Sequence, residues 1–186
     1  MIPGPLQLKS LKFGAHERFT FVDQPVAIVL MGVSGSGKSV VGTRLAEKLN
    51  YEFLDADNFH PPANIEKMKH GIPLTDEDRL PWLQNLHGEL GSRLNQGNSV
   101  ILACSALKET YRTILGQGLA QVRFVYLHVD KATLVERLQK RAGHFFPKEL
   151  LESQLATLET PHDALVVEEN RPLDEVVDTI VKAVEG

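Results

Sequence analysis

A glycine-rich loop between an apolar run and a helical pattern constrains the fold of this chain more than any other feature. Residues 32–39 read GVSGSGKS, which fits the pattern GxxxxGK[ST], and the apolar run VAIVLM precedes them at residues 26–31. Apolar residues then recur at helical spacing over residues 40–49. The pattern predicts a β-strand, a phosphate-binding loop and an α-helix in succession.

Each residue type in this loop suits the binding of a nucleotide. Glycines let the backbone turn so that its N–H groups form a concave nest, and the N-terminus of the following helix favours anions. Lys38 can reach the β- and γ-phosphates of ATP, and the Ser39 hydroxyl can ligate Mg²⁺. A turn that merely joins strand to helix would not need this full pattern. The predicted nucleotide-binding residues here are Gly32, Val33, Ser34, Gly35, Ser36, Gly37, Lys38 and Ser39.

Two aspartates follow the second predicted strand, residues 51–55. Asp55 and Asp57 are two residues apart, so both side chains can point into one cleft beyond the carboxyl end of the strand. A kinase needs one carboxylate near the metal and another that orients and deprotonates the attacking hydroxyl. The same residues could instead cap the next segment, and only their place beside a phosphate loop favours the functional interpretation.

Two helices are predicted between residues 64 and 94, where small-molecule kinases commonly cover their substrate. Thr75 and the acid three residues later have the spacing of a capping box, and Pro81 marks either the start of a helix or a kink in it. His60 and Arg79 stand at element ends near the expected cleft, which makes them candidates for binding the acceptor.

The second half of the chain continues the alternation of strand and helix. Apolar runs predict strands at residues 99–104, 122–129 and 164–168. The whole pattern predicts an α/β fold, a three-layer sandwich with a five-stranded parallel sheet, a phosphate loop and a helical lid. The strand at 99–104 lacks the terminal aspartate of many motor-type and switch nucleotidases, which counts against those classes.

The predicted lid carries two arginines. Arg137 and Arg141 are four residues apart on one helix face, and residues 143–147, GHFFP, then break the helix. Such a lid can close over the triphosphate and neutralise the charge that develops during transfer, although a solvated helix face is the ordinary alternative. The loop after the last strand can contact the adenine through Asn170, Arg171 and Pro172.

Composition limits the domain count and the class of partner. The 186 residues suit one phosphate-loop domain over residues 25–186, with residues 1–24 as an N-terminal extension. A net charge of −4 argues against nucleic-acid binding, and no apolar run is long enough to cross a membrane. Cys104 is the only cysteine, which excludes an intrachain disulfide and suits a reducing compartment. We therefore expect a cytoplasmic protein that acts on a small molecule.

Several segments together resemble the gluconokinases, a branch of the phosphate-loop kinases related in fold to shikimate and adenylate kinases. Besides residues 31–39, the matching segments are residues 54–61, 64–68, 71–79, 81–83, 103–108, 111–112 and 143–146. The phosphate loop alone marks a very broad superfamily, whereas this combination is far more specific. The resemblance implies Mg²⁺-assisted transfer of the γ-phosphoryl group of ATP to the 6-hydroxyl of D-gluconate, by an enzyme that is often a homodimer.

The resemblance also implies roles for individual residues. Asp57 would face the substrate hydroxyl, and His60, Arg79 and Lys108 would surround the gluconate. The chemistry of the phosphate loop, the aspartates and the lid adds Lys38, Arg137 and Arg141 to Asp57 as predicted catalytic residues, and Ser39 and Asp55 as predicted metal ligands. Gluconate needs a cation for its carboxylate and hydrogen-bonding groups for its hydroxyls. The predicted substrate-binding residues are Asp57, His60, Arg79, Lys108, Arg112 and His144.

Two alternatives stay open at this point. One is a phosphate-loop kinase for another small acceptor, such as shikimate or a nucleoside monophosphate. The other is a nucleotide-dependent switch without kinase activity, which would hydrolyse slowly without an acceptor and respond to a macromolecular partner.

Overall fold

The computed structural model describes residues 24–140 and 148–185, and its strands form one parallel sheet in the order β2-β3-β1-β4-β5. The strands are β1 (Ala27–Met31), β2 (Glu52–Asp55), β3 (Val100–Ala103), β4 (Val122–His128) and β5 (Leu165–Glu168). The helices are α1 (Lys38–Leu49), the 3₁₀ turn η1 (Ala56–Phe59), α2 (Pro62–Lys69), α3 (Asp76–Asn95), α4 (Glu109–Gly116), α5 (Lys131–Lys140), α6 (Lys148–Thr157) and α7 (Leu173–Glu185). The predicted α/β fold with a five-stranded parallel sheet is confirmed. Of the predicted extension, residues 1–23 lie outside the described residues.

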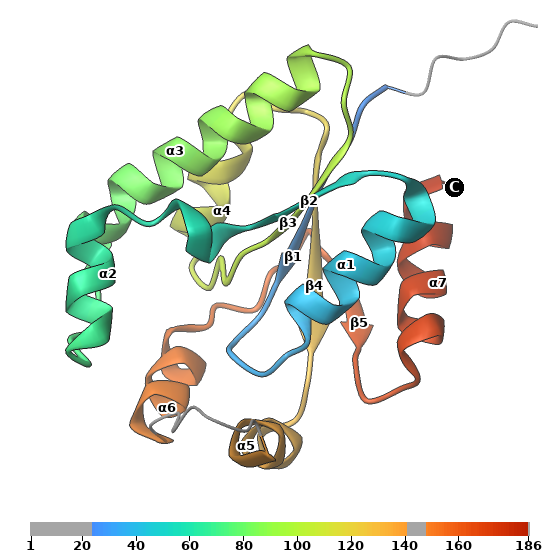
Figure 1. Ribbon diagram of the computed structural model, residues 1–186. Coiled ribbons are helices and arrows are strands. Elements are labelled where there is room, and N and C mark those ends of the chain that lie inside the picture. Colours follow the sequence, from blue (N-terminus) through green and yellow to red (C-terminus); the bar gives the residue numbers. More distant parts are fainter. Residues whose placement is uncertain (1–23, 141–147, 186) are drawn as a thin grey trace, which may run out of the picture.

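Helices cover both faces of the sheet, with α3 and α4 on one face and α1 and α7 on the other (Figure 1). The central strand β1 shows why. Ala27, Val29 and Met31 enter the apolar core formed with α3 and α4. Ile28 and Leu30 point the other way, into the core formed with α1 and α7. A parallel strand that is buried on both faces must be apolar throughout, which explains the uninterrupted run before the phosphate loop.

Helix α3 begins at the predicted capping box. The Thr75 hydroxyl accepts a hydrogen bond from the Asp78 amide at 3.2 Å, and the Asp78 carboxylate accepts one from the Thr75 amide at 3.0 Å. Pro81 lies inside the helix and does not start it. Among the residues described, no helix combines the length and apolarity that crossing a bilayer would require.

The carboxyl ends of the strands gather the loops of the candidate site at one edge of the sheet, with α5 and α6 beyond them (Figure 1). A third apolar cluster fills the space behind these loops. It consists of Val33, Leu107, Val129, Leu134, Leu138 and Leu151. The cluster joins the loop after β1 to the loop after β3 and to both helices, so the fold positions these parts relative to one another.

Candidate active site

The loop between β1 and α1 requires glycine at two positions where its backbone turns. Gly32 has a φ of 146°, and a Cβ atom there would lie 2.7 Å from the Ser36 Oγ and 3.0 Å from the Leu127 carbonyl. Gly37 has a φ of 86°, and a Cβ atom there would lie 2.5 Å from the Glu169 Oε1. Other residues rarely adopt these conformations, so the sequence pattern and the loop geometry agree.

Lys38 is bonded to the backbone of this loop. Its Nζ donates to the carbonyls of Gly32, at 2.9 Å, and Val33, at 3.0 Å. Burial lowers the pKa of Lys38, while the nearby charges of Asp57 and Asp55 oppose that shift. Because the next residue, Ser39, bonds to Asp55, and Asp55 bonds to the Asp57 amide, the phosphate-loop lysine and both predicted carboxylates lie in one part of the molecule.

Ser39, in the first turn of α1, and Asp55, at the end of β2, offer a pair of oxygen ligands. The Ser39 hydroxyl donates to the Asp55 Oδ2 at 3.1 Å, and both groups are solvent-accessible. Hydroxyl and carboxylate oxygens are ligands that Mg²⁺ prefers, so the residues present fit this ion. The Asp55 Oδ1 also accepts a hydrogen bond from the Asp57 amide at 3.1 Å, which caps η1. Asp55 thus fills the capping role that the sequence left as an alternative while keeping one oxygen towards Ser39.

His60, three residues after Asp57, packs against a buried tryptophan. Its ring stacks on the buried Trp82, with 4.2 Å between ring centroids and 12° between planes. The Trp82 indole N–H donates to the Ala56 carbonyl at 2.8 Å, which fixes the stack against η1. Burial lowers the pKa of His60, partly opposed by the charge of Asp57, so the imidazole is neutral near pH 7.

Arg79 and Lys108 form a cationic cluster around the Tyr111 ring. The Arg79 Cζ lies 5.8 Å and the Lys108 Nζ 5.6 Å from the centroid of that ring. Lys108 also pairs with Asp76 at 2.6 and 2.8 Å, and the Tyr111 hydroxyl donates to the same carboxylate. Hydrogen bonds from Lys108 and Tyr111 lower the pKa of Asp76.

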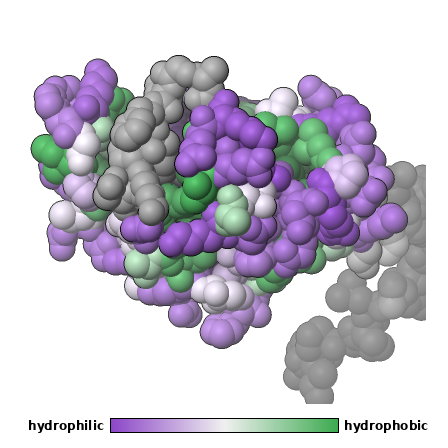
Figure 2. Space-filling view, turned by 90° about the horizontal axis from the view of Figure 1, so that it is seen from below, coloured by the Kyte–Doolittle hydropathy of each residue, from purple (hydrophilic) through white to green (hydrophobic). Residues whose placement is uncertain are grey.

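Figure 2, which views the molecule from below Figure 1, shows mostly hydrophilic surface broken by smaller hydrophobic patches.

Arg112 is placed differently from the other predicted acceptor-binding residues. It is buried, and its guanidinium donates to the carbonyls of Ala106, at 3.1 Å, and Leu107, at 3.2 Å. Ala106 has a φ of 44°, which is unusual for a residue other than glycine. Arg112 thus supports the strained loop that leads to Lys108, and this placement favours a positioning role over direct contact with the acceptor.

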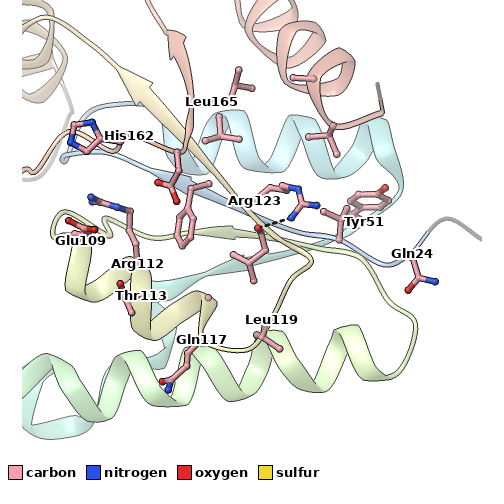
Figure 3. Close-up of a pocket in the computed structure, with 18 residues that line it drawn as sticks. Gln24, Tyr51, Glu109, Arg112, Thr113, Gln117, Leu119, Arg123, His162 and Leu165 are labelled. Atoms are coloured by element: carbon pink, nitrogen blue, oxygen red, sulfur yellow. Dashed lines mark hydrogen bonds between the residues drawn. The ribbon is translucent and has the colours of Figure 1, made fainter.

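A cavity of about 1010 Å³ lies away from the phosphate loop. It runs beside α4 and β4, with Gln24 and Tyr51, which precede β1 and β2, among its lining residues (Figure 3). Its Arg123 donates to the carbonyls of Ala120, at 2.6 Å, and Val122, at 3.1 Å. In open parallel sheets, ligands bind beyond the carboxyl ends of the strands, whereas Gln24 and Tyr51 mark amino ends. This cavity is therefore a poorer candidate for the active site than the residues grouped at the phosphate loop.

Arg137 is held at the phosphate loop by a residue that the sequence did not single out. Its guanidinium pairs with the Glu169 carboxylate, and the Glu169 side chain also lies against Gly37. Arg171 donates to the Glu168 carbonyl at 3.2 Å, in the exposed loop that also carries Asn170 and Pro172. The remaining predicted residues, Arg141 and His144, lie outside the described residues.

A second residue that the sequence did not single out is Gln154 in α6. Its carboxamide binds the amide and the hydroxyl of Ser34 in the phosphate loop. Neither Gln154 nor Glu169 belongs to a recognisable motif. The one available signal was the position of Glu169 directly after the last predicted strand.

Sequence comparison places the chain among known proteins. A family model described as an AAA domain matches residues 28–161. The gluconokinase of Gluconobacter oxydans is 49% identical over 140 residues, which cover 75% of this chain and 79% of that protein. The thermosensitive gluconokinase of Escherichia coli is 43% identical over 162 residues, which cover 85% of this chain and 87% of that protein. The chain belongs to the gluconokinase family.

Solved structures agree with this assignment. The crystal structure of a gluconokinase from Sinorhizobium meliloti is 44% identical, with a TM-score of 0.79 over 87% of this chain and 93% of that chain. Shikimate kinase from Aquifex aeolicus is 22% identical with a TM-score of 0.56, a likeness of fold alone. As a gluconokinase-family member, the protein is an enzyme of the kinase class, and its phosphate loop is a nucleotide-binding element.

Proposed function

We propose that this protein transfers the γ-phosphoryl group of ATP to the 6-hydroxyl of D-gluconate, giving ADP and 6-phospho-D-gluconate. The observation that carries the proposal is the set of hydrogen bonds that joins Ser39 of the phosphate-loop motif, Asp55 and Asp57 at the carboxyl end of the sheet, in a chain 43% identical to a gluconokinase over 85% of its length. The cationic cluster of Arg79 and Lys108 supplies what an anionic acceptor requires.

On the donor side, the amides of the phosphate loop would bind the β- and γ-phosphates of ATP. Lys38 would exchange its bonds to the Gly32 and Val33 carbonyls for phosphate oxygens, and Arg137 would add a second positive charge. Ser39 and Asp55 would hold Mg²⁺, which neutralises phosphate charge during transfer. Asn170, Arg171 and Pro172 stay predicted contacts to the adenine.

On the acceptor side, Asp57 would orient the 6-hydroxyl and accept its proton. The hydroxyl oxygen attacks the γ-phosphorus, the bond between that phosphorus and the β–γ bridging oxygen breaks, and ADP leaves. The proton on Asp57 then passes to solvent.

Gluconate would be oriented by groups already fixed in place. Lys108 and Arg79 would bind its carboxylate, and the neutral ring of His60 would hydrogen-bond a hydroxyl. Arg112 would act through the loop that it supports, while Arg141 and His144 stay predictions from the sequence.

A coupled ADP-release assay with Mg²⁺ and ATP tests this proposal. The acceptors are D-gluconate, other sugar acids, glycerate, shikimate and AMP, with a reaction lacking acceptor as the control. We expect a saturable response to gluconate that exceeds every other acceptor. Preference for shikimate or AMP would support the alternative acceptors, and slow release that is indifferent to all acceptors would support a nucleotide switch.

The role of Asp57 has its own test. Asp57→Asn keeps the shape of the side chain but removes the proton acceptor, so we expect kcat to fall by about 10²-fold or more, within the usual range for a general base. The unfolding temperature should stay near that of the wild type. A folded variant with near-normal turnover would remove Asp57 from the catalytic role.

The resemblance further implies a homodimer, and the single cysteine of the sequence favours a cytoplasmic location. Light scattering on the purified protein and fractionation of the source cells are the measurements that address these two predictions.

A further inference from the structure

One side chain of helix α6, Gln154, makes two hydrogen bonds to the phosphate loop. The Gln154 Oε1 accepts a hydrogen bond from the Ser34 amide at 2.7 Å, and its Nε2 donates to the Ser34 Oγ at 3.1 Å. A backbone N–H can only donate, which fixes the oxygen of the carboxamide on that side. Because donor and acceptor are held at a fixed spacing in one planar group, the two bonds set both the position and the orientation of Ser34 relative to α6.

The chain just after α6 is tied to the loop that carries Lys108. The Glu159 amide donates to the Leu107 carbonyl at 2.9 Å, and the Glu159 Oε2 accepts from the Glu109 amide at 2.6 Å. These bonds hold the residues on both sides of Lys108. A shift of this segment would therefore move the lysine that we propose to bind the acceptor.

An apolar contact joins the same two loops through α6. Leu151 is 1% exposed and packs in one cluster with Val33 of the phosphate loop and Leu107 of the Lys108 loop. Close-packed interiors transmit displacement because they leave little free volume. The helix and the short segment that follows it thus contact the donor loop and the acceptor loop by hydrogen bonds and by packing.

We propose that α6 couples the nucleotide and acceptor sites, with Gln154 as the positioning residue that makes the coupling; this rests on the proposed function for the identity of the two ligands. Phosphates bound to the loop amides fix the conformation of Ser34. Gln154 passes that constraint to α6, and Glu159 and Leu151 pass it to the loop of Lys108. By linkage, a bound acceptor must favour nucleotide binding by the same factor.

Calorimetric titration of the whole protein tests the coupling. The Kd of a nonhydrolysable ATP analogue with Mg²⁺ is measured with and without saturating gluconate, and the ratio of the two values is the coupling factor. We expect a wild-type ratio of about fivefold or more, the lower end of typical site-to-site coupling, and a ratio near one in Gln154→Ala. Gln84→Ala, at an exposed glutamine of α3, is the matched control and should keep the wild-type ratio.

Further variants separate this role from a structural one. Ser34→Ala removes only the hydroxyl partner, so it should lower the ratio, and adding it to Gln154→Ala should change the ratio no further. Gln154→Met keeps the side-chain length and is the variant to use if Gln154→Ala does not fold. A Gln154 variant that keeps the wild-type ratio, or a wild-type ratio near one, overturns the coupling alone. A wild type that does not bind gluconate overturns the proposed function and the coupling with it.

Discussion

Gly37 lies where the phosphate loop, α1 and the Arg137–Glu169 pair meet. Any other residue at this position would have to adopt a left-handed backbone conformation, which costs about 1–2 kcal/mol of stability. Its Cβ atom would also displace the Glu169 carboxylate. We expect Gly37→Ala to lower the unfolding temperature by roughly 2–8 °C and to raise the KM for ATP. Thermal unfolding and steady-state kinetics check both effects. Unchanged values would mean that the loop relaxes without loss of the nucleotide site.

His60 gives the stability of the protein a pH dependence of definite sign. Because burial lowers the pKa of His60 in the folded protein, the unfolded chain binds the proton more readily. Stability is therefore full above the unfolded pKa of about 6.5 and is lost as the pH falls from there towards the lower folded pKa.

We expect the unfolding temperature of the wild type to fall more steeply below about pH 6.5 than that of His60→Gln, which has no group that titrates there. The variant should be less stable at every pH because it loses the stack on Trp82. The test is therefore the slope of unfolding temperature against pH and not the unfolding temperature itself. Parallel curves for the two proteins would contradict the lowered pKa.

The residues that sequence reasoning identified are those whose chemistry is local. Lys38, Ser39 and Asp55 follow from a motif and a strand end, and the structure brings them together. Gln154 could not be found in this way. Its partner lies 120 residues away, and nothing in the sequence distinguishes it from a glutamine on a solvent-exposed helix face. Arg112 illustrates the reverse problem, since a cation in the right segment can be turned inward by nearby carbonyls that the sequence does not reveal.

At the scale of elements, α3 shows that the chemistry of helix ends predicts a boundary better than the position of a proline does. Pro81 lacks the N–H that would bond to the Glu77 carbonyl four residues earlier, but both residues are exposed, so water can satisfy that oxygen. The capping box at Thr75 fixes where the helix begins, and burial of its apolar face stabilises the helix past Pro81.

The same helix contains a glycine that no local contact explains. Gly88 is exposed in the middle of α3, and a Cβ atom there would meet no heavy atom within 4 Å. We expect Gly88→Ala to stabilise the protein by about 0.5–1 kcal/mol, because alanine loses less backbone entropy in a helix. The unfolding temperature should rise by roughly 1–4 °C with unchanged kinetics, which makes this variant the counterpart of Gly37→Ala. A decrease would reveal a close approach that the helix surface does not show.

At the scale of the whole molecule, the alternation of strand and helix predicted the fold class and the five parallel strands, but not their order. Strand β1 pairs with β3 and β4, which come much later in the chain. The residues of β1 do not specify which strands will flank it, because all of them are apolar and pack against the helices on one face of the sheet or the other. The order follows from the crossover helices and the need to cover both faces, which are properties of the complete domain.

The domain boundary predicted near residue 25 can be tested on the complete molecule. From Val26 onwards the chain is hydrogen-bonded to the rest of the domain. The Val26 amide donates to the Ser99 hydroxyl and the Ala27 amide to the Gln121 carbonyl, both at 3.1 Å. The five strands and the apolar clusters of the described residues all lie beyond this point. We expect a chain that begins at residue 25 to keep its unfolding temperature within about 2 °C.

The kcat/KM of this shortened chain for gluconate should also stay within about twofold of the full chain, since twofold corresponds to less than about 0.5 kcal/mol. A chain that begins at residue 32 is the control: it lacks β1, the strand at the centre of the sheet, and should not fold. A shortened chain that folds normally but loses about tenfold in kcat/KM would show that residues 1–24 contribute to the site, because tenfold corresponds to about 1.4 kcal/mol of transition-state stabilisation. The same loss together with a lower unfolding temperature would instead mean that these residues support the domain itself, and its boundary would then lie closer to the N-terminus than the apolar pattern predicts.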